Sequence, residues 1–123
     1  MKKETTQLTS DPSIPYGDIK PLQSLHKISE KEIDETIRIA VEKFGKEHQT
    51  RKLFEEMAEL QVALCQLADG RDTTGHVCEE IADVIIMCLQ MAQIYGPELV
   101  ERYANQKIFR LKTLLTNLST QIQ

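Results

Sequence analysis

The sequence contains no tryptophan, and phenylalanine and tyrosine together make up only 5% of its 123 residues. Turn formers are also scarce, with five glycines and four prolines. β-Sandwiches and barrels typically have many aromatic side chains in their strands and many turn-forming residues between them. Because both are in short supply, and no segment alternates strictly between apolar and polar residues, the composition favours an all-α protein.

Signals for export, for membrane insertion and for disulfide formation are also missing. The first ten residues are polar, so no secretory signal peptide is predicted. The longest apolar run, residues 84–89, is far shorter than the roughly 20 residues that span a bilayer. The three cysteines are odd in number and form no C-x-x-C pair, which argues against a disulfide framework or a cysteine zinc site. We therefore expect a cytoplasmic protein with reduced thiols and no membrane partner.

Positive charge is in deficit, because 15 lysines and arginines face 19 aspartates and glutamates, for a net charge of −4. A protein that coats nucleic acid carries a strongly basic surface, so a nucleic-acid polymer is not an expected partner. With 41% hydrophobic and 28% charged residues, the chain has the composition of a globular protein. Its length fits a single domain.

Four helical segments follow a proline-rich N-terminus. Residues 1–28 hold three of the four prolines and show no periodic pattern, so they are interpreted as an extended arm or tail. Ser29 and Glu32 form a capping-box pattern that begins a helix ending at Gly45. Apolar residues at helical spacing predict three more helices, and short connections predict a four-helix bundle. These helices cover residues 50–68, 76–95 and 97–118, which places the helical domain at 29–118 and a C-terminal tail at 119–123.

The segment 76–95 is apolar on two opposite faces. Its stripes consist of Val77, Ile81, Val84 and Cys88 on one face and of Ala82, Ile86 and Leu89 on the other. A helix that is apolar nearly all round must be covered nearly all round, and four short helices of one chain can hardly do this. We therefore expect the segment to lie at a subunit interface of a homo-oligomer; the alternative is the central core helix of a monomer.

The second and third predicted helices carry the same acidic pattern, Glu-Glu-Met-Ala-Glu-Leu in one and Glu-Glu-Ile-Ala-Asp-Val in the other. At about 100° per residue, Glu56 and Glu59 lie at the margin of one apolar stripe. Glu80 and Asp83 lie at the margin of the other. If the two helices pack as an antiparallel hairpin, the four carboxylates converge.

Four carboxylates in a partly dry site repel one another unless positive charge lies among them. Hard divalent cations take oxygen ligands, so we expect Mg²⁺, with Mn²⁺ as a possible substitute. A di-iron bundle would require Glu-x-x-His pairs. That motif is absent, because the residues three positions before the three histidines are Gln23, Gly45 and Thr73. The site is therefore predicted to be all-oxygen and non-redox; the alternative is a solvated acidic face.

The last predicted helix carries a lysine on its apolar face. With Leu111 as the reference position, Lys107 falls inside the apolar stripe and Arg110 lies on its edge. Lys107 is either a snorkelling or structurally paired lysine, or a cation directed at the phosphates of a metal-bound substrate. In the second interpretation Arg110 is a forked phosphate donor. Acids for a metal and cations for phosphate are the components of metal-assisted phosphoryl chemistry.

The two acidic pairs, Glu56-x-x-Glu59 and Glu80-x-x-Asp83 with twenty residues between them, resemble the E-x-x-E … E-x-x-D signature of the MazG-like, all-α nucleoside triphosphate pyrophosphohydrolases. The likeness covers about residues 30–115 and is greatest to short MazG-like proteins of bacteria and phages. It extends to Phe44-Gly45, residues 52–60, residues 76–87, Ile94-Tyr95-Gly96 and Lys107-x-x-Arg110-Leu111.

The resemblance implies a helical dimer or tetramer that hydrolyses a nucleoside triphosphate between the α and β phosphorus atoms. The products are a nucleoside monophosphate and pyrophosphate, as in house-cleaning of the nucleotide pool. Carried over by motif position, the implied Mg²⁺ ligands are Glu56, Glu59, Glu80 and Asp83, and the implied phosphate contacts are Lys107 and Arg110. Either Glu56 or Glu59 would serve as the general base. His48 and Gln49, just before the second predicted helix, are weaker candidates for nucleotide binding.

The sequence leaves two alternatives open. One is a non-catalytic helical oligomer in which the acids and Lys107 form only a structural ion network. The other keeps the fold and the metal but takes phosphoribosyl-ATP as the substrate, as in the related enzyme of histidine synthesis. The preferred base and sugar depend on hydrogen bonds in the pocket and not on the spacings.

Overall fold

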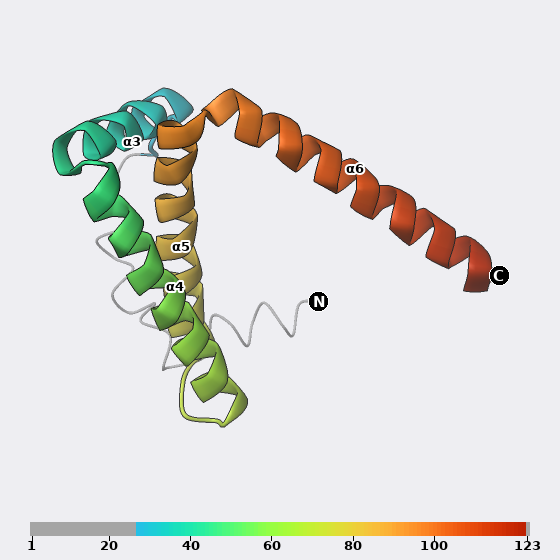
Figure 1. The fold of residues 1–123 in the computed structure, drawn as a ribbon. Coiled ribbons are helices and arrows are strands. Elements are labelled where there is room, and N and C mark those ends of the chain that lie inside the picture. Colours follow the sequence, from blue (N-terminus) through green and yellow to red (C-terminus); the bar gives the residue numbers. More distant parts are fainter. Residues whose placement is uncertain (1–26, 123) are drawn as a thin grey trace.

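The computed structural model describes residues 27–122, which form four helices and no strand (Figure 1). In chain order they are α3 (Glu30–Phe44), α4 (Lys46–Ala68), α5 (Thr74–Tyr95) and α6 (Pro97–Ile122). The prediction of an all-α chain is therefore confirmed over these residues. The arm predicted at residues 1–28 lies outside the described residues except for 27 and 28, which have no regular structure. Among the described helices, none has the length and apolarity needed to cross a bilayer.

Local signals place the boundaries of α3 where the sequence predicts them. The Ser29 hydroxyl accepts a hydrogen bond from the Glu32 backbone N–H at 3.2 Å, and the Glu32 carboxylate accepts one from the Ser29 N–H at 2.8 Å. This reciprocal capping box satisfies two N–H groups that the helix itself cannot. Gly45 ends α3 at φ +85°, a backbone conformation that favours glycine, and α4 begins at the next residue.

The other helices are longer than predicted. α4 begins at Lys46 and not near Thr50, and α5 begins at Thr74 because the Thr73 hydroxyl accepts a hydrogen bond from the His76 N–H. α6 runs to Ile122, so residues 119–122 of the expected tail are helical. Apolar periodicity marks only the part of a helix with an apolar face, so polar first and last turns escape it.

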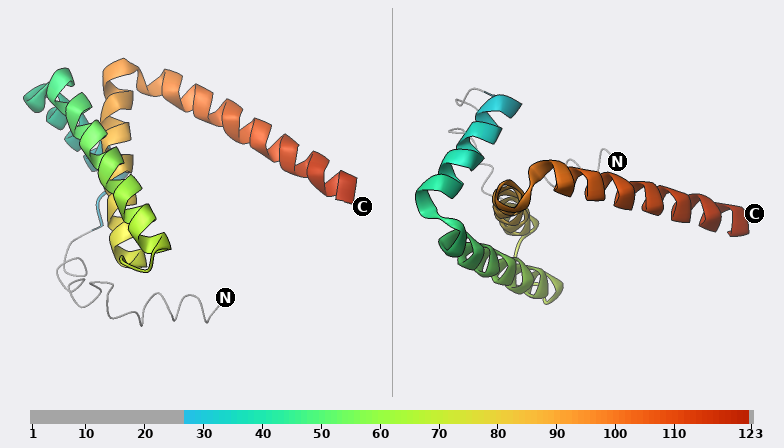
Figure 2. Two further views of the ribbon diagram at one scale, coloured as in Figure 1. Left: turned by 60° about the horizontal axis from the view of Figure 1, so that its bottom comes forward. Right: turned by 45° about the horizontal axis from the view of Figure 1, so that its top comes forward.

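α4 and α5 form an antiparallel hairpin, and α3 lies across the end of the hairpin where α4 begins (Figures 1 and 2). The apolar residues buried in this unit are Ala63, Val77 and Met87. Three polar residues are buried with them, namely Gln49, Glu56 and Gln90. The core of the three packed helices is thus thin and partly polar, and it lies along the contact between α4 and α5.

α6 leaves the end of α5 and projects away from the other three helices (Figures 1 and 2). Every side chain from Pro97 to Gln121 is exposed. A four-helix bundle is therefore not closed within one chain. The outer face of α5 is also uncovered, since Ile81, Ile85, Ile86 and Leu89 are each more than 40% exposed. Neither apolar stripe predicted for this helix is fully covered by the chain itself. In the first stripe Val77 is buried and Val84 is half-buried, but Ile81 and Cys88 are exposed. All three members of the second stripe are exposed, namely Ala82, Ile86 and Leu89.

Candidate metal centre

Two antiparallel helices bring three carboxylates together. Glu56 and Glu59 stand one turn apart on α4, and Glu80 faces them from α5. One oxygen of each carboxylate lies within 4.8 Å of the others. Glu56 is buried, the Glu80 side chain is 12% exposed and Glu59 is exposed. Because i and i+3 positions share one face of a helix, the matched spacing on the two helices produces this convergence.

Asp83 does not converge with the other three acids as the sequence predicts. It is exposed on α5 and does not belong to the group of three carboxylates. Burial of its carboxyl, followed by the negative charges of Glu56 and Glu79, raises the pKa of Asp83 above its usual value. The structure therefore brings together three of the four predicted acids, with Asp83 near enough for its charge to interact with Glu56.

Like charge dominates the electrostatics of the cluster. The negative charge of Glu56 raises the pKa of Glu59, and burial and the charge of Glu80 raise it further. The other two carboxylates thus make ionisation of Glu59 less favourable. A cation placed among the three oxygens would remove this repulsion.

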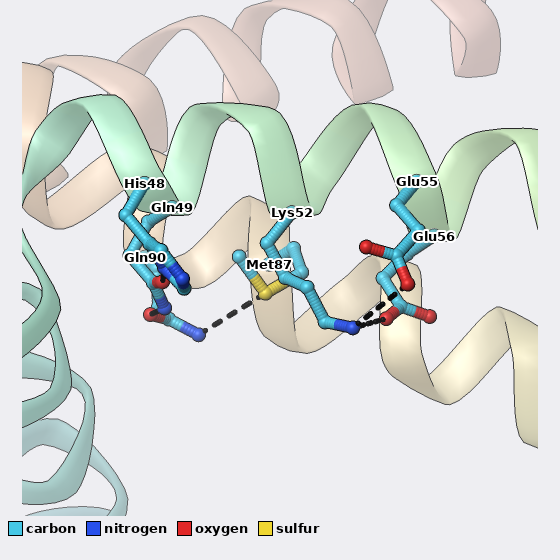
Figure 3. A network of polar contacts seen from close by, with 7 residues as sticks. All are labelled: His48, Gln49, Lys52, Glu55, Glu56, Met87 and Gln90. Carbon is cyan, nitrogen blue, oxygen red and sulfur yellow. Dashed lines mark hydrogen bonds and ion pairs between the residues drawn. The ribbon is translucent and has the colours of Figure 1, made fainter.

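Lys52 partly compensates Glu56 from one turn earlier on α4. Its ammonium lies 3.0 Å from Glu56 Oε1 and 3.2 Å from Glu55 Oε1 (Figure 3). The hydrogen bonds to Glu56 and, second, to Glu55 raise the pKa of Lys52 well above its usual range. One oxygen of Glu56 is therefore occupied by a cation of its own helix.

His76 has the corresponding position on α5. Its Nε2 lies 3.0 Å from Glu80 Oε1, and its Nδ1 lies 2.8 Å from Asp72 Oδ2. The hydrogen bond to Asp72 is the main cause of a raised His76 pKa, and the same bond lowers the pKa of Asp72. Glu80 Oε2 is buried and has no hydrogen-bond partner among the described residues. A buried carboxylate oxygen without a donor is costly unless a cation binds it.

A hollow of about 430 Å³ opens beside the cluster between α4 and α5. Its lining residues are Ala58, Glu59, Val62, Ala63, His76 and Glu80. Two of the clustered carboxylates are therefore accessible from one concave surface. A ligand in this hollow would meet the carboxylates and an apolar wall together.

The predicted phosphate contacts lie away from the acids. Lys107 and Arg110 are exposed on α6, which projects from the hairpin (Figure 1). Lys107 was expected on a core face, but no core covers any face of α6 in the single chain. The chain by itself therefore does not bring its predicted cations to its predicted metal ligands.

The two weaker candidates for nucleotide binding, His48 and Gln49, lie in the first turn of α4. Gln49 is buried, and its amide donates to Gln90 Oε1 at 2.5 Å (Figure 3). His48 Nδ1 lies 2.7 Å from Gln49 Oε1, and the His48 ring stacks on Phe44. The Gln49 amide thus has partners within the protein on both of its polar atoms, which favours a structural role for this residue.

The site predicted from the sequence does not include Lys52, His76 or Gln90. The spacing Lys52-x-x-x-Glu56 and His76-x-x-x-Glu80 contains the signal for the first two, since i and i+4 side chains are neighbours on a helix. Gln90 pairs with Gln49, 41 positions earlier, and no local pattern predicts this contact. Comparison with known protein families, curated proteins and solved structures finds no match to this chain.

Proposed function

We propose that this chain is a Mg²⁺-dependent pyrophosphohydrolase that cleaves a nucleoside triphosphate between the α and β phosphorus atoms. The single observation that carries the proposal is the convergence of Glu56, Glu59 and Glu80 across the α4–α5 hairpin. This convergence agrees with the use of the E-x-x-E … E-x-x-D spacing as a metal signature. Because its substrates would be free nucleoside triphosphates, we propose that the enzyme works in the cytoplasm.

The donor set fits a hard divalent cation. Three carboxylates supply oxygen ligands, Asp83 stands one turn beyond Glu80, and Glu80 Oε2 lacks a partner among the described residues. Mg²⁺ prefers such ligands, and Mn²⁺ accepts them. The chemistry that the ion supplies when bound is neutralisation of phosphate charge and a lowered pKa of water.

The surroundings of the two candidate bases favour Glu59 as the general base. Glu56 is buried, and its Oε1 is held by Lys52. Glu59 is exposed and lines the hollow. A carboxylate at an accessible surface is suited to accept a proton from water as the water oxygen attacks phosphorus. The bond that breaks joins the bridging oxygen to that phosphorus.

We propose that a second copy of the chain supplies the phosphate contacts, in a homodimer or homotetramer. Lys107 and Arg110 lie on a helix that projects from its own hairpin (Figure 1). The apolar faces of α5 and α6 are uncovered, and burying them against another copy would be favourable. A docked α6 would then bring two cations toward the acids of its partner, where they would bind the triphosphate.

A substrate panel tests the activity directly. The protein is incubated with the ribo- and deoxynucleoside triphosphates and with phosphoribosyl-ATP in the presence of Mg²⁺, and pyrophosphate release is measured. We expect release from at least one nucleoside triphosphate and none when the metal is chelated. Release from phosphoribosyl-ATP alone would support the alternative substrate, and no release from any compound would contradict the enzyme.

Matched variants connect the activity to the cluster. Glu59→Gln should lower turnover by about 10²–10⁴-fold because it removes the general base, and Asp83→Asn should abolish turnover with helicity retained in circular dichroism. Glu79→Gln is the control, since it removes the same charge from an exposed position on α5. Full activity in Glu59→Gln would overturn its assigned role.

A non-catalytic helical oligomer is the second candidate, and one observation favours it. Each of the two less exposed acids already pairs with a cation on its own helix, Glu56 with Lys52 and Glu80 with His76. Ion pairs of this kind can serve structure alone. A chain that forms oligomers but neither binds Mn²⁺ nor releases pyrophosphate would have this role.

A further inference from the structure

On α4 and on α5, a nitrogen-bearing side chain precedes the two acids of the matching pattern. On α4, Lys52 precedes Glu56 by four residues, and its ammonium lies 3.0 Å from Oε1. On α5, His76 precedes Glu80 by four residues, and its Nε2 lies 3.0 Å from Oε1. In each helix a nitrogen donor one turn earlier thus holds one oxygen of the acid that is less exposed to solvent.

The two donors differ in how firmly they are themselves held. The Lys52 ammonium is a flexible point charge divided between Glu56 and Glu55. The His76 ring is planar and contacts a carboxylate at each nitrogen, since Nδ1 lies 2.8 Å from Asp72 Oδ2. Contacts on both sides leave the ring little freedom to rotate.

Asp72 is in turn fixed at the start of α5. Its side chain is 9% exposed, and Oδ1 accepts a hydrogen bond from the Thr73 N–H at 2.7 Å. Thr73 caps the helix by accepting from the His76 N–H. A continuous chain of contacts therefore runs from the capped end of α5 through Asp72 and His76 to one oxygen of Glu80.

The consequence of this chain is visible at the other oxygen of Glu80. Oε1 faces His76, while Oε2 is buried with no hydrogen-bond partner among residues 27–122. Glu80 also contributes an oxygen to the three-carboxylate cluster. The Glu80 carboxylate therefore has one oxygen in contact with His76 and one buried oxygen without a partner among the described residues.

We propose that His76, itself held by Asp72, is the positioning residue that orients Glu80 for a divalent cation. The Nε2–H donor fixes the carboxylate through Oε1 and leaves Oε2 available as the ligand. Hydrogen bonds from outside the coordination sphere commonly orient metal ligands in this way. This inference rests on the proposed metal site, but not on any particular substrate.

A positioning role and a ligand role for His76 differ in the proton on Nε2. Both ring nitrogens lie near carboxylate oxygens, Nδ1 near Asp72 and Nε2 near Glu80. An Nε2–H that donates to Glu80 has no lone pair for a metal, whereas a ring with its proton on Nδ1 would offer Nε2 to the ion. The spectroscopic test below separates these two roles.

Titration of the full chain with Mn²⁺, followed by electron paramagnetic resonance, tests the proposal without any substrate. His76→Asn retains an amide within reach of Asp72 but is too short to contact Glu80. We expect it to weaken Mn²⁺ affinity by about 10–100-fold. His76→Gln places an amide N–H near the position of Nε2 and should retain most of the affinity. Asp72→Asn should cause a smaller loss than His76→Asn.

Asp69→Asn is the matched control for Asp72→Asn, because it removes the same charge from a carboxylate that pairs with Arg71 in the loop before α5, with no other charged partner among the described residues. It should leave Mn²⁺ affinity unchanged. Circular dichroism and thermal melting of each variant verify the fold. Affinity in His76→Asn equal to that of the unaltered chain would overturn the proposal, as would equal losses in His76→Asn and His76→Gln.

Electron spin echo modulation of bound Mn²⁺ adds a spectroscopic test. A positioning role predicts no directly coordinated nitrogen, and a strong nitrogen coupling that disappears in His76→Asn would overturn it. Failure of the proposed function has a different signature. If the unaltered chain binds Mn²⁺ as described but hydrolyses no triphosphate, the enzyme proposal fails and the role of His76 stands; if it binds no Mn²⁺, both fail.

Discussion

The α4–α5 hairpin and α6 differ in environment more than in sequence character. All three helices are long, at 23, 22 and 26 residues, and each carries apolar residues at helical spacing. The hairpin buries Ala63, Val77 and Met87, whereas every side chain of α6 from Pro97 to Gln121 is exposed. An apolar stripe thus determines which face a helix can bury, but not what covers it.

The connections explain the difference. A five-residue link, residues 69–73, returns the chain antiparallel along α4, so that α5 packs against it. Between α5 and α6 stands only Gly96, at φ +132°, followed by Pro97. Proline is favoured in the first turn of a helix, so α6 starts at once. It starts in a direction that leads away from the hairpin (Figure 2).

Charge follows the same division. The hairpin holds three clustered carboxylates, and α6 carries the exposed cations Lys107 and Arg110. The predicted metal ligands and the predicted phosphate contacts therefore lie on separate parts of one chain. Three predictions test whether the α4–α5 hairpin and α6 have the separate roles that this division of charge implies.

Leu111→Asp should have the largest effect, because it places a charge on the apolar face of α6. If that face packs against a second copy, an uncompensated buried charge costs about 3–5 kcal/mol, and the oligomer should dissociate to monomer. Light scattering coupled to size-exclusion chromatography measures the mass. Thr113→Asp, on the opposite side of α6, is the control and should retain the oligomer. An unaltered chain that is monomeric at micromolar concentration would contradict the proposed assembly.

Ala63→Leu should have an intermediate effect, confined to the hairpin. Ala63 is 1% exposed, so a larger side chain must displace its neighbours. Overpacking of this kind lowers the free energy of unfolding by about 1–3 kcal/mol. Ala68→Leu, at the exposed end of the same helix, should change it by no more than about 0.5 kcal/mol. Urea denaturation measures both, and equal effects would show that the α4–α5 contact is not tightly packed.

Glu59→Gln should have the smallest effect, a slight stabilisation of the metal-free chain at neutral pH. Because acidic neighbours raise the pKa of Glu59 in the folded state, ionised Glu59 disfavours folding above that pKa. The disadvantage disappears as the pH falls through the raised pKa and the carboxyl is protonated. Thermal melts in a chelator should therefore show a gain that decreases toward acid pH. Saturating Mg²⁺ should cancel the gain, and a gain that is independent of pH and metal would contradict this origin.

Much of the local structure could be predicted from the sequence because its causes are local. The Ser29–Glu32 capping box and Gly45 define the ends of α3 through contacts within a few residues. The matched acidic pairs could be found because i, i+3 spacing fixes a shared helix face. Polar helix ends were missed, since α4 and α6 begin or continue without an apolar pattern.

The candidate site was predicted less completely. Glu56, Glu59 and Glu80 converge as the hairpin model requires, but Asp83 does not join the group of three. The predicted site does not include His76 and Lys52 as partners of the acids, although both stand at i, i+4 spacing. Gln49 is a weaker candidate for nucleotide binding in the sequence, and only the fold shows that its amide is bonded to Gln90.

By itself the sequence determined the all-helical class, the number of described helices and which acids share a helix face. These properties follow from backbone hydrogen bonding and helical periodicity, which act over a few residues. Only the tertiary structure decided which side chains meet across α4 and α5, that Glu80 Oε2 is buried without a partner among the described residues, and that α6 projects away from the hairpin. Those outcomes depend on how helices distant along the chain pack, because burial arises only where two surfaces meet.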